Sequence, residues 1–157
     1  RYQAYQGVSV PAFPNAFLTI GPYAYAPSSY LELIEATSAH ATRVITETRS
    51  RGATCCEVRQ EPHDRYFEWA VERTHKTHLF TDSCAGSNTY YINYQGDAWL
   101  RPSTALGMSW SNRHFPLEHY CYTTADSRPS ARGTPGRREP TRAANGNGQH
   151  QRNKVTV

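Results

Sequence analysis

The sequence has few of the residues that build a large apolar core. Only 38% of its 157 residues are hydrophobic, which is low for a folded domain of this size. Aromatic side chains, among them 11 Tyr and 3 Trp, must then supply much of the buried area. We expect one domain of ordinary size with a small core that is rich in aromatic rings.

Segments and motifs of several common protein classes are also missing. No run of about 18 apolar residues is present, which predicts that no helix spans a membrane. The sequence contains no G-x-S-x-G, no phosphate-binding loop, no H-E-x-x-H and no calcium loop. It has no signal peptide, so a chain that begins at Arg1 indicates that a leader was removed or that a longer precursor was cleaved.

The remaining acidic and basic residues do not form a convincing catalytic group. Glu68 and Glu72 lie close in sequence to Arg65, Arg73 and Lys76, so we interpret them as solvated ion-pair partners. We therefore expect no catalytic activity and no cofactor.

Lysine is scarce, and the net positive charge belongs to the end of the chain. Two lysines, Lys76 and Lys154, stand against 15 arginines. From Asp126 onward there are seven basic and two acidic residues, whereas the first 125 residues carry a net charge of −1. Residues 127–157 are rich in Pro, Gly, Arg and polar side chains, a composition typical of segments that cannot bury a core.

Four cysteines, Cys55, Cys56, Cys84 and Cys121, favour a disulfide-containing domain of a secreted protein. The neighbours Cys55 and Cys56 point to opposite sides of a strand, so a bond between them is strained. We expect at least one bridge from this pair to Cys84 or Cys121, and the sequence does not choose among the three connectivities.

Alternating apolar residues and β-branched runs predict a mainly β fold, a single antiparallel domain of trefoil, barrel or sandwich type. The expected core contains Phe67, Trp69, Val71, Tyr91 and Phe115. Helices at 30–40 and at 64–78 remain alternatives to strands. We expect a Pro-rich N-terminal arm at 1–27, a β-rich domain at 28–126 and a basic tail at 127–157. The expected strands are 42–48, 54–59, 66–73, 89–94, 98–101 and 114–122.

A zinc site is conceivable but matches no established motif. On a helix, His75 and His78 would face the same way, and on a strand they would face apart. His119 and Cys121 are spaced to share one face of a strand. Because none of these spacings is typical of zinc proteins, we predict no metal and keep the four residues as candidates only.

Several aromatic and turn segments resemble the fibroblast growth factor family. The residues that carry this resemblance are Thr89–Gly96, Leu100–Pro102 and His114–Leu117, with Tyr30–Leu33 and Phe67–Val71 upstream. The resemblance implies a β-trefoil. The family's Cys-x-Phe-x-Glu motif is replaced here by residues 65–69, and its lysine-rich loop by the nearly uncharged residues 103–110.

These observations lead to two hypotheses about function. The first is a secreted, disulfide-stabilised, growth-factor-like protein that binds a receptor outside the cell. The alternative is a structural subunit of a large assembly, such as a virus capsid, cleaved from a precursor and contacting neighbouring subunits.

The basic tail leads to a testable prediction. Its arginines lie among residues that cannot fold alone, so they remain available to polyanions through contacts that depend steeply on salt. Deleting residues 127–157 should abolish retention on a polyanion column at low salt and leave the melting temperature of the body nearly unchanged. Equal retention of the truncated chain would contradict this prediction. The candidate residues are Arg128, Arg132, Arg137, Arg138, Arg142, Arg152 and Lys154.

Overall fold

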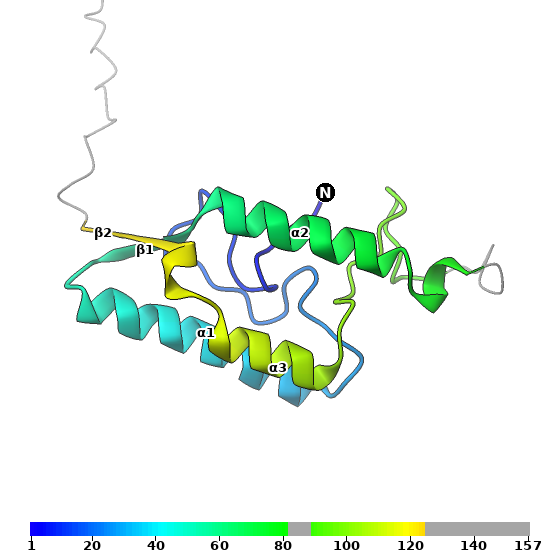
Figure 1. Cartoon of the computed structure of the whole chain (residues 1–157), viewed down its shortest axis with the longest axis horizontal. Coiled ribbons are helices and arrows are strands. Elements are labelled where there is room, and N and C mark those ends of the chain that lie inside the picture. The colour runs from blue at the N-terminus through cyan, green and yellow to red at the C-terminus, as the bar shows by residue number, and fades with distance from the viewer. Residues whose placement is uncertain (82–88, 125–157) are drawn as a thin grey trace, which may run out of the picture.

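The computed structural model describes residues 1–81 and 89–124, and within them the fold is mainly helical. The prediction of a mainly β domain is therefore wrong. Figure 1 shows helix α2 on one side of the N-terminal coil and the pair α1 and α3 on the other. None of these helices is long and apolar enough to span a membrane in the described part of the chain. The elements are α1 (Tyr30–Ser50), β1 (Cys55–Val58), α2 (Gln60–Thr74), a 3-10 turn (His78–Phe80), α3 (Ala105–His114), a second 3-10 turn (Leu117–His119) and β2 (Tyr120–Thr123).

Helix α1 continues through the segment that was predicted to be a strand at 42–48. The Ser29 side chain caps its first turn by accepting a hydrogen bond from the Leu31 amide. Buried residues recur along one face at helical spacing, and this burial outweighs the strand preference of the β-branched residues in the second half. The predicted helix at 30–40 is thus present but much longer than expected. The buried residues are Leu33, Ala36, Thr37, His40, Val44 and Thr48.

Helix α2 replaces the strand predicted at 66–73. Pro62 lies in the first turn, where its missing amide hydrogen is not needed. The buried residues Pro62, Tyr66, Ala70 and Thr74 follow one another at intervals of four, which is the spacing of a helix face. The alternative of a helix here was correct in type, although the helix begins at Gln60 rather than near Asp64.

Helix α3 lies in a segment for which the sequence suggested no element. Thr104 caps it by accepting a hydrogen bond from the Gly107 amide at 3.1 Å, and Met108 and Asn112 are its buried residues. The expected strand at 114–122 is wrong over its first two thirds, since β2 begins only at Tyr120. There, β2 pairs antiparallel with β1, with Cys56 opposite Tyr122; the strand predicted at 54–59 is confirmed.

The predicted strands at 89–94 and 98–101 reduce to a turn closed by a single bridge between Ile92 and Ala98. The Asn93 side chain accepts hydrogen bonds from the amides of Gln95 and Asp97, and Gly96 takes the positive φ of +80° that the turn requires. The two flanking runs therefore do not form a ladder.

The core is small and aromatic, as the composition predicts. Tyr5, in the N-terminal coil, is 3% exposed, and its ring meets five other rings edge-on. Phe115 is buried as expected, whereas Phe67, Trp69 and Val71 are only partly buried and pack against the core; Tyr91 is also only partly buried. The rings around Tyr5 are those of His40, Tyr66, Phe115, His119 and Tyr120.

Gly7 marks the closest approach within the coil. It has a φ of +76°, and a Cβ added there would lie 2.2 Å from the Ala24 Cβ. Gly52 has a similar φ of +64°, but a Cβ would meet nothing within 4 Å.

The comparison of these two glycines gives a prediction. Gly52→Ala should lower the free energy of unfolding by about 1 kcal/mol because of its φ alone. Gly7→Ala should lower it by roughly 1–3 kcal/mol more, because the coil must also move away from Ala24. Urea unfolding of both variants tests this, and equal losses would show that the close contact does not constrain the fold.

Candidate functional site

A chain of buried polar side chains connects four separate segments. His40 of α1 is fully buried, with Nδ1 2.8 Å from Asn112 Oδ1 and Nε2 2.7 Å from Tyr120 Oη. Tyr120 Oη also lies 2.7 Å from Ser9 Oγ. Because the Asn112 amide donates to the Met108 carbonyl, its Oδ1 must be the acceptor for His40. This assigns the proton of His40 to Nδ1, and Nε2 then accepts from the Tyr120 hydroxyl.

Burial keeps this chain electrically neutral. It lowers the pKa of His40 to about 3, and the positive charges of Arg43 and Arg101 act in the same direction. Burial also raises the pKa of Tyr120 well above its ordinary value. The Phe115 ring stacks on His40 with centroids 3.8 Å apart. Since the imidazole is enclosed and stays neutral near pH 7, we assign it to holding segments together and not to acid–base catalysis.

A second polar group surrounds Arg101, which is only 3% exposed. Its guanidinium donates to Gln6 Oε1 at 2.8 Å and to the hydroxyls of Ser103 and Ser111. The cation lies 5.4 Å from the Tyr66 ring centroid. Its Nη1 has no hydrogen-bond partner, and no carboxylate pairs with it among residues 1–81 and 89–124.

An open cavity of about 560 Å³ borders Arg101. Trp69, Arg73 and Thr74 of α2 form one wall, and Ser103 and Thr104 are on the other. Arg73 and Arg101 line the cavity and no carboxylate is among its described lining residues, so these residues give it a positive potential, which favours negatively charged groups. The Arg101 donors themselves point at protein atoms or are enclosed, so of the two guanidinium groups that of the exposed Arg73 is the one accessible to a ligand.

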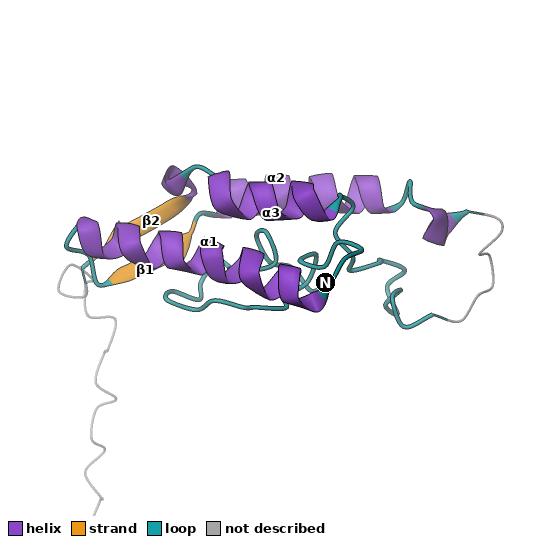
Figure 2. Ribbon diagram, turned by 90° about the horizontal axis from the view of Figure 1, so that it is seen from below, coloured by secondary structure: helices purple, strands orange, loops and turns teal. Residues whose placement is uncertain are grey.

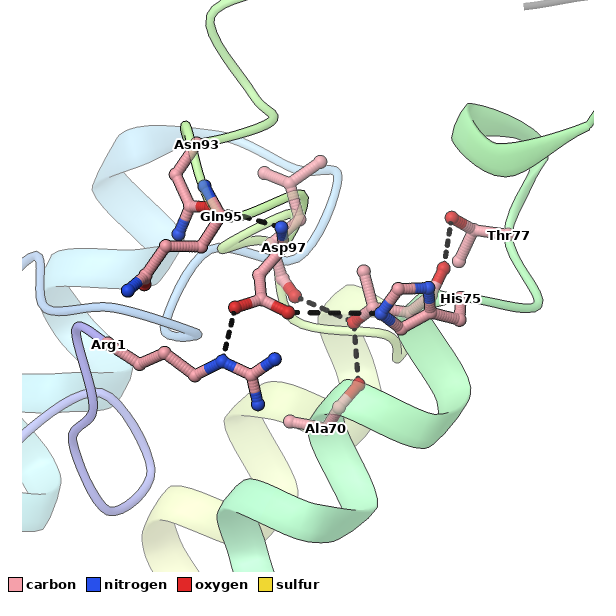
Figure 3. A network of polar contacts seen from close by, with 9 residues as sticks. Arg1, Ala70, His75, Thr77, Asn93, Gln95 and Asp97 are labelled. Carbon is pink, nitrogen blue, oxygen red and sulfur yellow. Dashed lines mark hydrogen bonds and ion pairs between the residues drawn. The ribbon is translucent and has the colours of Figure 1, made fainter. Parts of the chain in front are cut away.

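A third group centres on Asp97, which is 3% exposed. Figure 3 shows its carboxylate between Arg1 and His75. Arg1 Nε and Asp97 Oδ2 form an ion pair at 2.9 Å, but their geometry is not that of a hydrogen bond. His75 Nε2 lies 3.8 Å from Asp97 Oδ1. These contacts join the start of the chain, the turn after Asn93 and the end of α2. No nucleophilic side chain takes part, and we assign this group to structure.

The candidate metal ligands do not come together. His75 follows the last residue of α2, whereas the His119 carbonyl accepts from the Arg59 amide just before the first residue of α2. The 15 residues of α2 separate them by roughly 20 Å. His119 Nδ1 lies 2.6 Å from the Tyr5 hydroxyl instead. No group of three potential ligands occurs in the described part of the chain, and the side chain of His78 lies outside it.

The expected disulfide is not found. Cys55 and Cys56 lie in β1 and Cys121 lies in β2, but no bridge joins these three cysteines to one another. Cys56 Sγ instead donates to Asn15 Oδ1 at 3.4 Å. Cys84 lies outside the described residues, as do all the candidate polyanion-binding residues of the tail. The prediction of a disulfide-stabilised protein is therefore wrong for the described cysteines.

The exposed carboxylates follow the interpretation made from the sequence. Glu72 Oε1 lies 2.6 Å from Lys76 Nζ, with both side chains about 70% exposed. Such pairs contribute little to stability or chemistry.

The residues of the buried polar groups were not predicted, and for His40 the reason is that strands were preferred to helices in the sequence. His40 lies four residues before Val44 and seven after Leu33, on the buried face of α1. A helical interpretation of 30–50 would have placed it in the core. Arg101 carried no comparable signal, since its partner Gln6 lies 95 residues away in the sequence.

Comparison with solved structures identifies a fold relationship that the sequence did not suggest. Residues covering 78% of this chain match a steroid monooxygenase bound to NADP, with a TM-score of 0.64 and 16% identity. A cyclohexanone monooxygenase from Rhodococcus sp. Phi1 bound to NADP+ matches with a TM-score of 0.59 and 14% identity over 80% of this chain. OTEMO in complex with FAD and NADP matches with a TM-score of 0.55 and 16% identity over 77% of this chain.

The chain spans only about a quarter of those proteins, between 23% and 24% of their length. No family model matches the sequence, and no curated protein matches it. The helical fold and these matches overturn the resemblance to fibroblast growth factors. They also contradict both functions expected from the sequence, the growth-factor-like ligand and the capsid subunit.

The residues present do not fit a complete dinucleotide site. Such sites need a parallel β-α-β unit with a glycine-rich turn at the start of its helix. The sheet in the described part has two antiparallel strands, and the sequence has no G-x-G-x-x-G. We therefore derive no reaction step through FAD or NADP at these residues.

The neutral His40 gives a prediction about pH. An unfolded histidine titrates near 6.5 and His40 in the folded chain near 3, so the unfolded state binds more protons between these values. The stability that burial of neutral His40 provides is complete above pH 6.5 and is lost as the pH falls through this window. Lowering the pH from 7 to 5 should cost about 2 kcal/mol of unfolding free energy.

Urea unfolding at the two pH values checks this expectation. Burial also lowers the pKa of His119, so His119 adds to the loss of unfolding free energy at low pH. The variant His119→Gln should still show most of this loss, because His40 causes the larger part of it. The exposed His114 serves as the control, and His114→Gln should leave the loss unchanged. An unfolding free energy that is equal at pH 7 and pH 5 would contradict the neutral burial of His40.

Proposed function

We propose that this chain forms a scaffold segment of a monooxygenase that uses NADP and FAD. The observation that carries the proposal is the similarity of more than three quarters of the chain to part of three monooxygenases, all bound to NADP and one also bound to FAD. The enzyme would act through residues of this segment together with residues that the segment does not contain.

The fold supports a scaffolding role over a catalytic one. The buried groups around His40, Arg101 and Asp97 each join segments that are distant in sequence. Their side chains are mostly enclosed, and they hold the helices and the N-terminal coil in one arrangement. Parts of an enzyme that position others are typically rigid in this way.

The proposed enzyme would transfer one oxygen atom of O₂ to its substrate and reduce the other to water, with two electrons and one proton from NADPH, oxidised to NADP+, and one further proton from solvent. The names of the matched proteins suggest steroids and cyclohexanone as the first substrates to test.

Native material is required to test this proposal. Antibodies raised against residues 1–124 would isolate the protein from its source, and the product would be examined for bound flavin by its absorption spectrum. NADPH oxidation would then be measured with cyclohexanone and, as a control without a carbonyl group, with cyclohexanol. We expect bound flavin and oxidation of NADPH that cyclohexanone or a ketosteroid accelerates.

Two results would overturn the proposal. One is native material that contains the chain but neither flavin nor NADPH-oxidising activity. The other is a crystal structure of the native protein in which α1, α2 and α3 do not superimpose on the matched monooxygenases.

A further inference from the structure

Helix α1 has a second apolar face that nothing in the described chain covers. Its inner face packs into the core, as an amphipathic helix requires. On the opposite side lies an outer stripe, which we define as Leu31, Ile34, Ser38, Thr42 and Ile45. These residues share one face, since they are spaced by three or four along the helix. All are exposed, and none is charged.

The apolar members of the outer stripe are exposed to an unusual extent. Leu31 is 73% exposed, Ile34 40% and Ile45 39%. Both views place α1 at the outside of the molecule (Figures 1 and 2). A solvated helix normally carries charged or polar residues on such a face, so three large aliphatic side chains at helical spacing indicate a contact surface.

The stripe continues onto the N-terminal coil. The Thr37 hydroxyl donates to the Thr19 carbonyl at 2.9 Å, which holds the coil against the flank of α1. The neighbours of Thr19 in this coil are Leu18, which is 41% exposed, and Ile20, which is 50% exposed. The coil therefore places two more exposed aliphatic residues beside α1 near Thr37, although the Ile20 side chain itself lines a hollow with Tyr2 and Trp99. We call these two residues and the outer stripe together the apolar patch.

The size of the patch favours a partner that is held by other contacts as well. From Leu31 to Ile45 the stripe is about 21 Å long, so it covers on the order of a few hundred Å². A stable dimer of two separate chains needs roughly 1,200 Å² or more in total. The five residues of the outer stripe include no basic side chain. Nucleic acids and other polyanions bind to basic side chains, so the stripe does not suit them.

We infer that the outer stripe of α1, with Leu18 and Ile20, packs against the part of the monooxygenase that this chain does not contain. About three quarters of the length of the matched enzymes lies outside the segment that they share with this chain. A body of that size provides both an apolar surface for the patch and additional contacts elsewhere. This inference rests on the proposed function.

The test compares side-chain accessibility in two forms of the protein. Hydroxyl-radical footprinting with mass spectrometry would be applied to the 157-residue chain alone and to the native flavin-containing material. We expect Leu31, Ile34 and Ile45 to react several-fold less in the native material. Tyr94, which is 90% exposed in a distant turn, serves as the control and should react equally in both.

A pair of variants gives a second, independent measurement. Ile45→Glu in the complete enzyme should reduce flavin retention, because a charge would be buried against an apolar partner. Thr46→Glu places the same charge one residue along, on a neighbouring exposed face, and should retain flavin. In the 157-residue chain alone, both variants should leave the melting temperature nearly unchanged.

The possible outcomes separate this inference from the proposed function. Active, flavin-containing material in which the stripe stays reactive would overturn the inference and leave the function standing. Native material without flavin or NADPH oxidation would overturn the function, and protection of the stripe would then have to be assigned to another partner. If the chain alone sediments as a dimer that Ile45→Glu dissociates, the occupant is a second copy and the inference is wrong.

Discussion

The fold depends on one buried, neutral histidine. His40 donates one hydrogen bond to Asn112 and accepts one from Tyr120. The Tyr120 hydroxyl also bonds to Ser9 and so extends the chain of hydrogen bonds. These residues belong to α1, β2, α3 and the N-terminal coil. A charged imidazole would have to be desolvated at great cost, so the same burial that joins the segments also prevents protonation. Because every member is paired, the polar chain specifies one arrangement of a core that has few aliphatic residues.

The Arg101 and Asp97 groups extend this arrangement to the other end of the molecule. Arg101 connects the coil at Gln6 with α3 at Ser111. Asp97 brings Arg1 and His75 to the turn at residues 93–97. In each case a charged side chain joins separate segments of the chain, a role that contacts within the apolar core fill in larger domains. These contacts hold the described segments in one arrangement without a large sheet, as the scaffold role proposed for this chain would require.

Local signals predicted local features correctly. The β1 strand and the start of α1 near Tyr30 follow from residue types within a few positions. The helices α1 and α2 were misread because β-branched and aromatic runs favour strands locally, and burial of residues such as His40, Val44 and Tyr66 overrides that preference. Asn112 and Tyr120 lie 72 and 80 residues from His40, and Gln6 lies 95 residues from Arg101. No pattern in a single sequence connects these partners. The fold relationship to monooxygenases likewise has no motif in this sequence.

The protonation state of His40 tests the account most directly. The ring nitrogens of ¹⁵N-labelled protein can be followed by NMR while the pH is lowered from 7.5 to 5. We predict that one histidine keeps the shifts of a neutral ring with the proton on Nδ1, and that this signal is lost in His40→Gln. A His40 that titrates near its ordinary value of 6.5 while the chain stays folded would show that the imidazole is open to water, and would contradict the central role of this buried hydrogen-bond chain.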